Sequence, residues 1–134
     1  MAVDTETSSL DPHQADLIGV SLSSKIGKAC YIPIGHNSKI CLSKDVVIKK
    51  LKPLLEDPSI KKIGQNIKFD FIVLFKHGIN ICSMEDTMLM SYVLDAGKNR
   101  HNMDTLSEIH LNHKTISFKD LVGSGKKEIN FREV

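Results

Sequence analysis

Two acidic residues separated by one threonine, Asp4-Thr5-Glu6, stand near the start of the chain in a segment typical of a β-strand. Side chains two positions apart on a strand point to the same face, so both carboxylates would project together. Carboxylate oxygens in pairs are ligands that a divalent cation such as Mg²⁺ prefers. An Asp-x-Glu triplet is also common by chance, and on the triplet alone we favour a solvated strand end.

A third acidic residue, Asp70, follows the segment Gly64-Gln65-Asn66 inside an expected helix. Asn66 and Asp70 are four residues apart and would share one helix face. Asn66 is equally a good helix cap, and Asp70 could simply be exposed. The residues around Asp70 are apolar: Ile63, Ile67, Phe69 and Phe71. An acid among so much apolar surface is more often functional or paired than idle.

The elements that must position these acids begin with strands. Branched and alternating residues predict strands over residues 1–6, 17–22 and 29–34, and the short polar turn at 23–28 predicts an antiparallel hairpin. A further short, buried strand is expected over residues 60–64. Strands followed by alternating helices and strands indicate an α/β domain whose mixed sheet is antiparallel at one edge.

Helical spacing of apolar residues predicts four helices. The first begins after Ser43, with Pro53 near its end, and the second opens at Gln65 or Asn66 and stops before Gly78. Residues 83–86 resemble a capping box ahead of a third helix that ends at Gly97. A fourth helix is capped by Asn102 and reaches residue 111, and beyond it we expect only a turn or two of structure.

The composition is that of an ordinary globular protein. The chain has 134 residues, of which 41% are hydrophobic and 25% charged, which excludes a disordered chain and fits one domain over residues 1–134. Its 18 Lys and Arg against 16 Asp and Glu leave a net charge of +2, which names no partner. No apolar run approaches the roughly 20 residues of a membrane helix, so no membrane partner is expected.

Three cysteines, Cys30, Cys41 and Cys82, are odd in number and far apart, so we expect neither a disulfide framework nor a cysteine zinc site. The first residues lack the basic start and apolar stretch of a secretory signal. Both observations favour a reducing, cytoplasmic compartment. Lysines at 61–62, 68 and 126–127 could contact phosphates or could form a solvated face.

Five segments in unbroken order carry a resemblance to a known family: AVDTETSSLDPHQADLIGVSLS, YIPIGH, LLEDPSIKKIGQNIKFD, DTMLMSYVLD and HNMDTLSEIHLNHKTISFKDLVGSGKK. With them the chain resembles the 3′–5′ proofreading exonuclease domain of bacterial family A DNA polymerases, the DNA polymerase I type. The Asp-x-Glu triplet is unspecific, but the ordered set of segments is highly specific.

The resemblance implies an RNase H-like (DnaQ-like exonuclease) fold and hydrolysis of the 3′-terminal phosphodiester of single-stranded DNA. In that family four acidic residues hold two divalent cations, Mg²⁺ or Mn²⁺, which stabilise the attacking and the leaving oxygen. By this match Asp4 would bridge the two metals. Glu6 would bind the nucleophile-side metal and the terminal nucleotide. Asp70 would hold the second metal, partly through water.

Contacts to the substrate are implied by the same resemblance. Thr7 and Leu10 align with residues that contact the terminal nucleotide and wedge against its base. Phe118 aligns with an aromatic residue that stacks on a base, which suits a sequence-tolerant binder of single strands. The other residues that the resemblance places in the groove for the terminal nucleotide are Gln65, Asn66 and Phe69.

The family's third motif, Tyr-x-x-x-Asp, lies on a helix downstream of the region matched by residues 131–134 and is not found here. Tyr92 is three residues from Asp95, and Tyr31 is followed at the fourth position by Gly35. We therefore expect an exonuclease domain that stops short, with three carboxylates of four. Because ligand charge sets cation affinity and tyrosine positions the water, we expect a site that fills only at high Mg²⁺ or Mn²⁺ and cleaves weakly or not at all.

In the family the downstream helix covers the sheet. We therefore expect an exposed apolar face that favours self-association or a missing C-terminal or polymerase segment. Three functions stay open: a 3′–5′ exonuclease, whole or assembled with a missing segment; a non-catalytic remnant that binds single-stranded DNA; and a fragment with no independent role. The absent third motif favours the latter two for this polypeptide in isolation, whereas the family resemblance favours the first.

Overall fold

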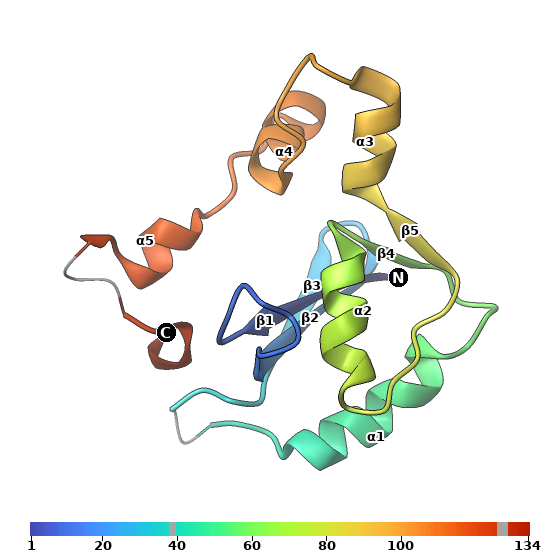
Figure 1. The fold of residues 1–134 in the computed structure, drawn as a ribbon, viewed down its shortest axis with the longest axis vertical. Helices are drawn as coiled ribbons and strands as arrows, with labels where there is room; N and C mark the ends of the chain where they lie inside the picture. Colours follow the sequence, from blue (N-terminus) through green and yellow to red (C-terminus); the bar gives the residue numbers. More distant parts are fainter. Residues whose placement is uncertain (38–39, 126–128) are drawn as a thin grey trace.

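The computed structural model describes residues 1–37, 40–125 and 129–134. Within these residues a sheet has the strand order β3-β2-β1-β4-β5 (Figure 1). β1 pairs with β2 and β2 with β3 in antiparallel fashion, whereas β4 is parallel to β1 and β5 is parallel to β4. This is the predicted mixed sheet with an antiparallel edge. The strands are β1 (Ala2–Thr7), β2 (Leu17–Lys25), β3 (Lys28–Pro33), β4 (Lys62–Gly64) and β5 (Met84–Asp86).

The helices begin close to where the sequence predicts them. Asn102 caps its helix as expected, accepting a hydrogen bond from the Thr105 amide at 3.3 Å. Pro53 lies inside the last turn of its helix. In the C-terminal part Ser117 and Asp120 form a capping box. The helices are α1 (Lys44–Leu55), α2 (Ile67–Phe75), α3 (Thr87–Asp95), α4 (Met103–Leu111), α5 (Phe118–Val122) and the 3₁₀ helix η2 (Phe131–Glu133).

The capping box predicted at residues 83–86 is wrong. Ser83 has a φ of 54° and lies outside the third helix, while the following residues pair with β4 as the parallel strand β5. Asp86 is the N-cap instead, and its Oδ1 accepts hydrogen bonds from the amides of Met88 and Leu89 at 2.9 and 3.3 Å. Strand pairing, a tertiary interaction, therefore overrides the local helix-start signal.

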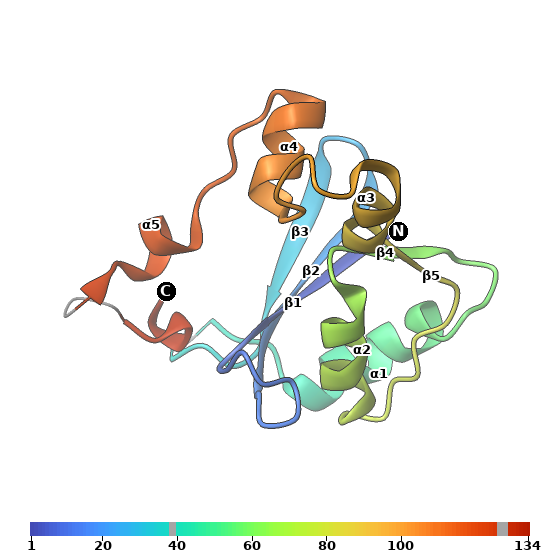
Figure 2. The same cartoon turned by 45° about the horizontal axis from the view of Figure 1, so that its top comes forward.

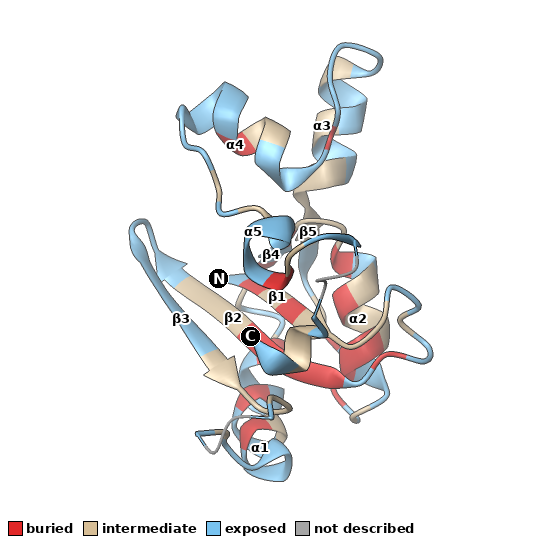
Figure 3. Cartoon of the chain, turned by 90° about the vertical axis from the view of Figure 1, so that its left-hand side faces the viewer, coloured by how far each residue is buried: buried red, intermediate tan, exposed pale blue. Residues whose placement is uncertain are grey.

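Residues alternate between the two faces of the sheet along β1. Val3 and Thr5 are buried against the hydrophobic core, whereas Asp4 and Glu6 point to the opposite face and are half-buried. Figure 3 shows the buried residues gathered in β1, β2, α1 and α2. The core residues that these elements share include Leu17, Val20, Val47, Leu51, Leu55, Val73 and Leu74.

The helices α3 and α4 lie at the opposite end of the molecule from α1 (Figures 1 and 2). Among its described residues α3 has none that is buried, and Val93 and Leu94 are 85% and 78% exposed. A groove of about 690 Å³ runs between these helices and the Asp4 face of the sheet. No helix in the described part of the chain is long and apolar enough to cross a membrane.

Candidate active site

Asp70 is tied directly to the strand that carries the other two acids. Its Oδ1 accepts hydrogen bonds from the backbone amide and from the hydroxyl of Thr5, at 2.8 and 2.6 Å. Thr5 stands between Asp4 and Glu6, so one helix residue and one strand residue hold all three acids in the same region. Asp70 is only 2% exposed, and the two hydrogen bonds satisfy one oxygen of this buried carboxylate.

The short length of β4 explains why Asp70 can reach β1. β4 pairs with β1 only at Ala2, opposite Ile63, and the chain then turns into α2 after Gly64. The edge of β1 beyond Ala2 is therefore open on this side, and the Thr5 amide needs another acceptor. The first turn of α2 supplies that acceptor in Asp70. The same local geometry therefore completes the sheet edge and brings the third acid to the first two.

Burial and mutual repulsion perturb the acids. Burial, followed by the charges of Asp4 and Asp70, raises the pKa of Glu6 to about 7. Burial also raises the pKa of Asp70 to about 7, with a smaller contribution from Asp4 and an opposing one from the Thr5 hydrogen bonds. Burial raises the pKa of Asp4 as well. Perturbed acids that repel one another are typical of functional sites.

The donor chemistry of this region fits a hard divalent cation. Asp4, Glu6 and Asp70 offer only carboxylate oxygens, and a bound cation would offset the burial and the mutual repulsion that together raise the pKa of Glu6. Over residues 1–37, 40–125 and 129–134, however, no three His, Cys, Asp or Glu side chains are grouped closely enough to hold a metal ion together. The acids influence one another without forming a closed ligand set, so the predicted metal residues stay a prediction.

The residues expected to contact the terminal nucleotide differ widely in exposure. Leu10 is 96% exposed in the loop after β1, and its expected role as a wedge against the terminal base stays a prediction. The hydroxyl of Thr7 donates a hydrogen bond to the Ser9 carbonyl at 3.0 Å and so shapes that loop. Phe118 is 55% exposed and stacks on Phe131, with ring centroids 5.7 Å apart. Phe69 packs against the hydrophobic core and is only partly buried.

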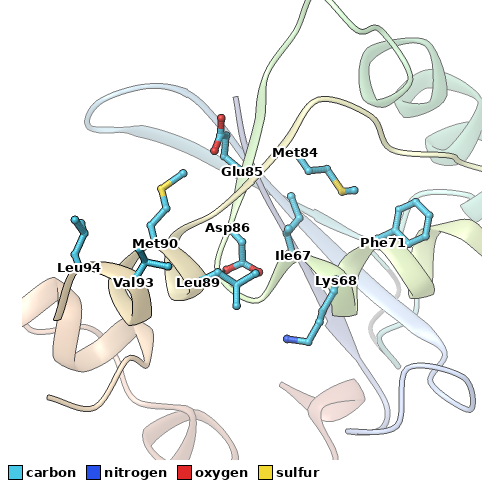
Figure 4. Close-up of a pocket in the computed structure, with 10 residues that line it drawn as sticks. All are labelled: Ile67, Lys68, Phe71, Met84, Glu85, Asp86, Leu89, Met90, Val93 and Leu94. Atoms are coloured by element: carbon cyan, nitrogen blue, oxygen red, sulfur yellow. The ribbon is translucent and has the colours of Figure 1, made fainter. Parts of the chain in front are cut away.

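Gln65 and Asn66 have structural partners within the protein. The Gln65 side chain donates to the His101 carbonyl and accepts from the Thr87 hydroxyl, both at 2.6 Å, and so connects the end of β4 to α3 and α4. The backbone amide of Asn66 donates to Asp86 Oδ1 at 3.0 Å. Figure 4 shows Asp86 between Ile67 of α2 and Leu89 of α3, where it also caps α3.

Three of the lysines considered for phosphate contacts have partners within the protein. Lys62 is fully buried, and its Nζ donates to the Asp57 carbonyl at 2.7 Å, so it cannot contact a phosphate. Lys61 forms an ion pair with Glu85 at 2.8 Å. Lys68 is exposed and contacts the side chain of Asn66. The lysines at 126–127 lie outside the described residues.

Sequence reasoning missed two features of the site. In the sequence Thr5 is only the residue between two acids, whereas in the structure its backbone amide and hydroxyl hold Asp70. Tyr31 lies beside Glu6, whose charge contributes after burial to a Tyr31 pKa of about 12. An alternating strand pattern places Tyr31 and Glu6 on one face only once the strand register is known, so no local signal could have revealed this contact.

Comparison with known proteins now identifies the family. A family model described as 3′–5′ exonuclease matches residues 1–134. The chain belongs to the 3′–5′ exonuclease family. This exonuclease chain is 44% identical to DNA polymerase I of Pseudomonas aeruginosa over 140 residues, which cover all of this chain and 15% of that protein. It therefore spans about a seventh of the length of that curated relative.

Solved structures agree with the family and with the fold of this exonuclease chain. NrnC of Brucella melitensis with bound Mg²⁺ superposes with a TM-score of 0.70 at 30% identity, covering 87% of this chain and 55% of that one. The same protein bound to pGG gives a TM-score of 0.68 at 27% identity, covering 95% and 61%. The mixed sheet is therefore that of an RNase H-like nuclease, as the family resemblance implied.

Proposed function

We propose that this exonuclease chain hydrolyses the 3′-terminal phosphodiester of single-stranded DNA, as one domain of a DNA polymerase I type protein. The observation that carries the proposal is the pair of hydrogen bonds from Thr5 to Asp70, which bring the helix acid beside Asp4 and Glu6. The mutual repulsion of these acids supports it further, because a purely structural cluster would gain nothing from uncompensated charge.

Asp4, Glu6 and Asp70 are the residues that would hold Mg²⁺ or Mn²⁺. When bound, such ions lower the pKa of a water molecule and stabilise the oxygens that attack and leave. Thr5 holds Asp70 in place by donating two hydrogen bonds to its Oδ1, one from the backbone amide and one from the hydroxyl. Asp4 and Glu6, on the face of β1 opposite the core, would hold the ions on the side of the terminal phosphate, since carboxylates alone would repel it.

The nucleotide would be held by residues that flank the acids. Leu10 would wedge against the terminal base, with Thr7 shaping its loop, and Phe118 would stack on a base exposed by the single strand. From the α2 side Gln65, which lines the groove beside α3 and α4, would contact the nucleotide together with Asn66 and Phe69. Stacking on flat aromatic rings does not depend on base identity, so we expect little sequence preference.

Weak activity is the expected behaviour of these 134 residues on their own. Only three acids of the family's four are present, and the sequence contains no Tyr-x-x-x-Asp motif. A binding module that retains the groove without cleaving is the second candidate function. The observation that favours it is that no closed ligand set for a metal forms among the described residues.

The deciding experiment follows digestion of a 5′-labelled single-stranded oligonucleotide in Mn²⁺, in Mg²⁺ and in EDTA. We expect slow shortening from the 3′ end in Mn²⁺, less in Mg²⁺, none in EDTA, and at least a hundredfold loss in Asp4→Ala. Asp45→Ala, which removes an exposed acid on α1, is the matched control and should cleave at the wild-type rate. Binding without any shortening would favour the binding module, and digestion that survives Asp4→Ala would exclude this site.

A further inference from the structure

Tyr31 of β3 lies across β2 on the face that carries Asp4 and Glu6. The register pairs Tyr31 with Ser21, and Ser21 in turn with Asp4, so these residues share one face of the sheet. A Cβ atom at Gly19 would overlap the hydroxyl and ring of Tyr31, which means that the phenol lies directly over this glycine. Gly19 is the register partner of Glu6. The Tyr31 hydroxyl therefore adjoins the Glu6 side chain.

His36 fixes the position of this hydroxyl. Its Nε2 lies 2.5 Å from Tyr31 Oη, and its ring packs against Phe131 with centroids 5.7 Å apart. The residues on both sides of His36 are held by Arg132. The Arg132 guanidinium donates to the Gly35 carbonyl at 2.9 Å, and the Arg132 carbonyl accepts from the Asn37 amide at 2.8 Å.

The surroundings of His36 also indicate which of its two ring nitrogens carries the proton. Its Nδ1 is buried and has no hydrogen-bond partner among the residues that the structure describes. An unpaired buried N–H is rarer in proteins than an unpaired acceptor, so we assign the ring proton to Nε2. In that tautomer His36 donates to the Tyr31 oxygen. The O–H of Tyr31 is then free to donate to another acceptor on the Glu6 side.

We propose that Tyr31 is a positioning residue of the hydrolytic site, whose hydroxyl, held by His36 over Gly19, would donate a hydrogen bond to the Glu6 carboxylate during hydrolysis. The inference rests on the proposed function and deepens it. Glu6 lies near Asp4 and Asp70, which repel it, and no basic side chain of the described part of the chain forms an ion pair with it. A neutral donor can orient such a carboxylate without competing for a metal ion through charge.

The alternative is a packing role, in which the Tyr31 ring merely covers the glycine in β2. Tyr31→Phe separates the two roles, because it keeps the ring and removes only the hydroxyl. Tyr92→Phe is the matched control, since Tyr92 is the other tyrosine of the chain. It lies in α3 and packs on His101, with ring centroids 3.9 Å apart.

The test measures kcat and KM for single-stranded oligonucleotide cleavage in Mn²⁺, together with oligonucleotide affinity in EDTA. For Tyr31→Phe we expect kcat to fall about tenfold or more, while KM, affinity and melting temperature stay at wild-type values. Tyr92→Phe should match the wild type throughout. An unchanged kcat in Tyr31→Phe would overturn the positioning role, even though the proposed function would stand.

A second measurement needs no activity. Nitrogen-15 NMR of histidine-labelled wild-type protein identifies which ring nitrogen of His36 carries the proton, with His36→Gln assigning the signal. A proton on Nε2 supports the inference. A neutral ring protonated on Nδ1 would commit the Tyr31 hydroxyl to His36 and overturn it. If wild-type protein cleaves nothing, the proposed function fails and this measurement alone still decides the orientation of Tyr31.

Discussion

The part of the molecule up to β5 and the part after it are stabilised in different ways. The residues of the core cluster all lie between Val3 and Ile81, in the sheet, the loop before β2, α1, α2 and the loop after α2. In the later part of the described chain the buried residues are His101, Ser107 and Val122. Polar contacts attach this part instead, such as the hydrogen bond from Gln65 to the His101 carbonyl.

This contrast separates the two halves of the proposed chemistry. The acids stand on β1 and α2, where the core fixes them. Phe118, which is expected to stack on a base, packs on Phe131 of η2, and η2 is held by the Arg132 contacts to Asp16 and Gly35. Segments with few buried contacts open most easily, so we expect the C-terminal part to loosen before the acids separate.

The largest expected effect is on stability and comes from the core. Leu74 of α2 is fully buried, and Leu74→Ala should cost about 2–5 kcal/mol of unfolding free energy through lost burial and a residual cavity. Leu94→Ala on α3, where the side chain is 78% exposed, should change it by no more than about 0.5 kcal/mol. Urea denaturation measures both. Equal losses would mean that the two parts share one core.

The next effect concerns pH. The fold raises the pKa of Asp70 from 3.8 to about 7, so the folded chain holds this proton more tightly than the unfolded chain does. Its contribution to stability is complete below about pH 4 and is lost as the pH rises towards 7. Asp70→Asn cannot lose a proton and can still accept from Thr5. Between pH 5 and 8 its unfolding free energy should fall by about 1–3 kcal/mol less than that of the wild type.

Urea denaturation across this pH range measures the difference, and Asp45→Asn on the exposed side of α1 is the control. Parallel pH profiles of the unfolding free energy for wild type and Asp70→Asn would show that folding does not raise the pKa of Asp70. Mn²⁺ added at pH 8 should stabilise the wild type and leave Asp70→Asn less affected, because a bound cation favours the folded state.

A smaller effect is expected where the two parts meet. The Oδ1 atom of Asp86 caps α3 and accepts from the Asn66 amide ahead of α2. Asp86→Ala should therefore cost about 1–2 kcal/mol of unfolding free energy. Asp95→Ala, which breaks an exposed ion pair with Lys98, should cost under about 1 kcal/mol. A cost for Asp86→Ala no larger than that of Asp95→Ala would contradict this role.

The smallest effect on stability, and the clearest on assembly, concerns the exposed apolar side chains of α3. We propose that these side chains bind a second copy of the chain, because large exposed apolar patches favour association. Val93→Glu should shift a self-associating sample to monomer in sedimentation velocity while changing the unfolding free energy by less than about 0.5 kcal/mol. Wild-type protein that stays monomeric at high concentration would contradict the proposal.

Local sequence signals predicted most elements of this protein. Alternation gave the three antiparallel strands, and Asn102 and Gly97 marked helix boundaries that the structure confirms within a residue or two. The signal at residues 83–86 failed because two strands pair there. The ordered family segments correctly predicted the exonuclease family and its fold, which composition and charge could not do.

The sequence by itself determined the residue types of the site, since the spacing of Asp4 and Glu6 on a strand sets their common face. Only the tertiary structure decided that Asp70 bonds to Thr5, that the open edge of β1 makes room for it, and that Tyr31 lies over Gly19 beside Glu6. The reason is that alternation fixes which side of its own strand a residue occupies, whereas contacts between strands depend on register and on where a neighbouring strand ends.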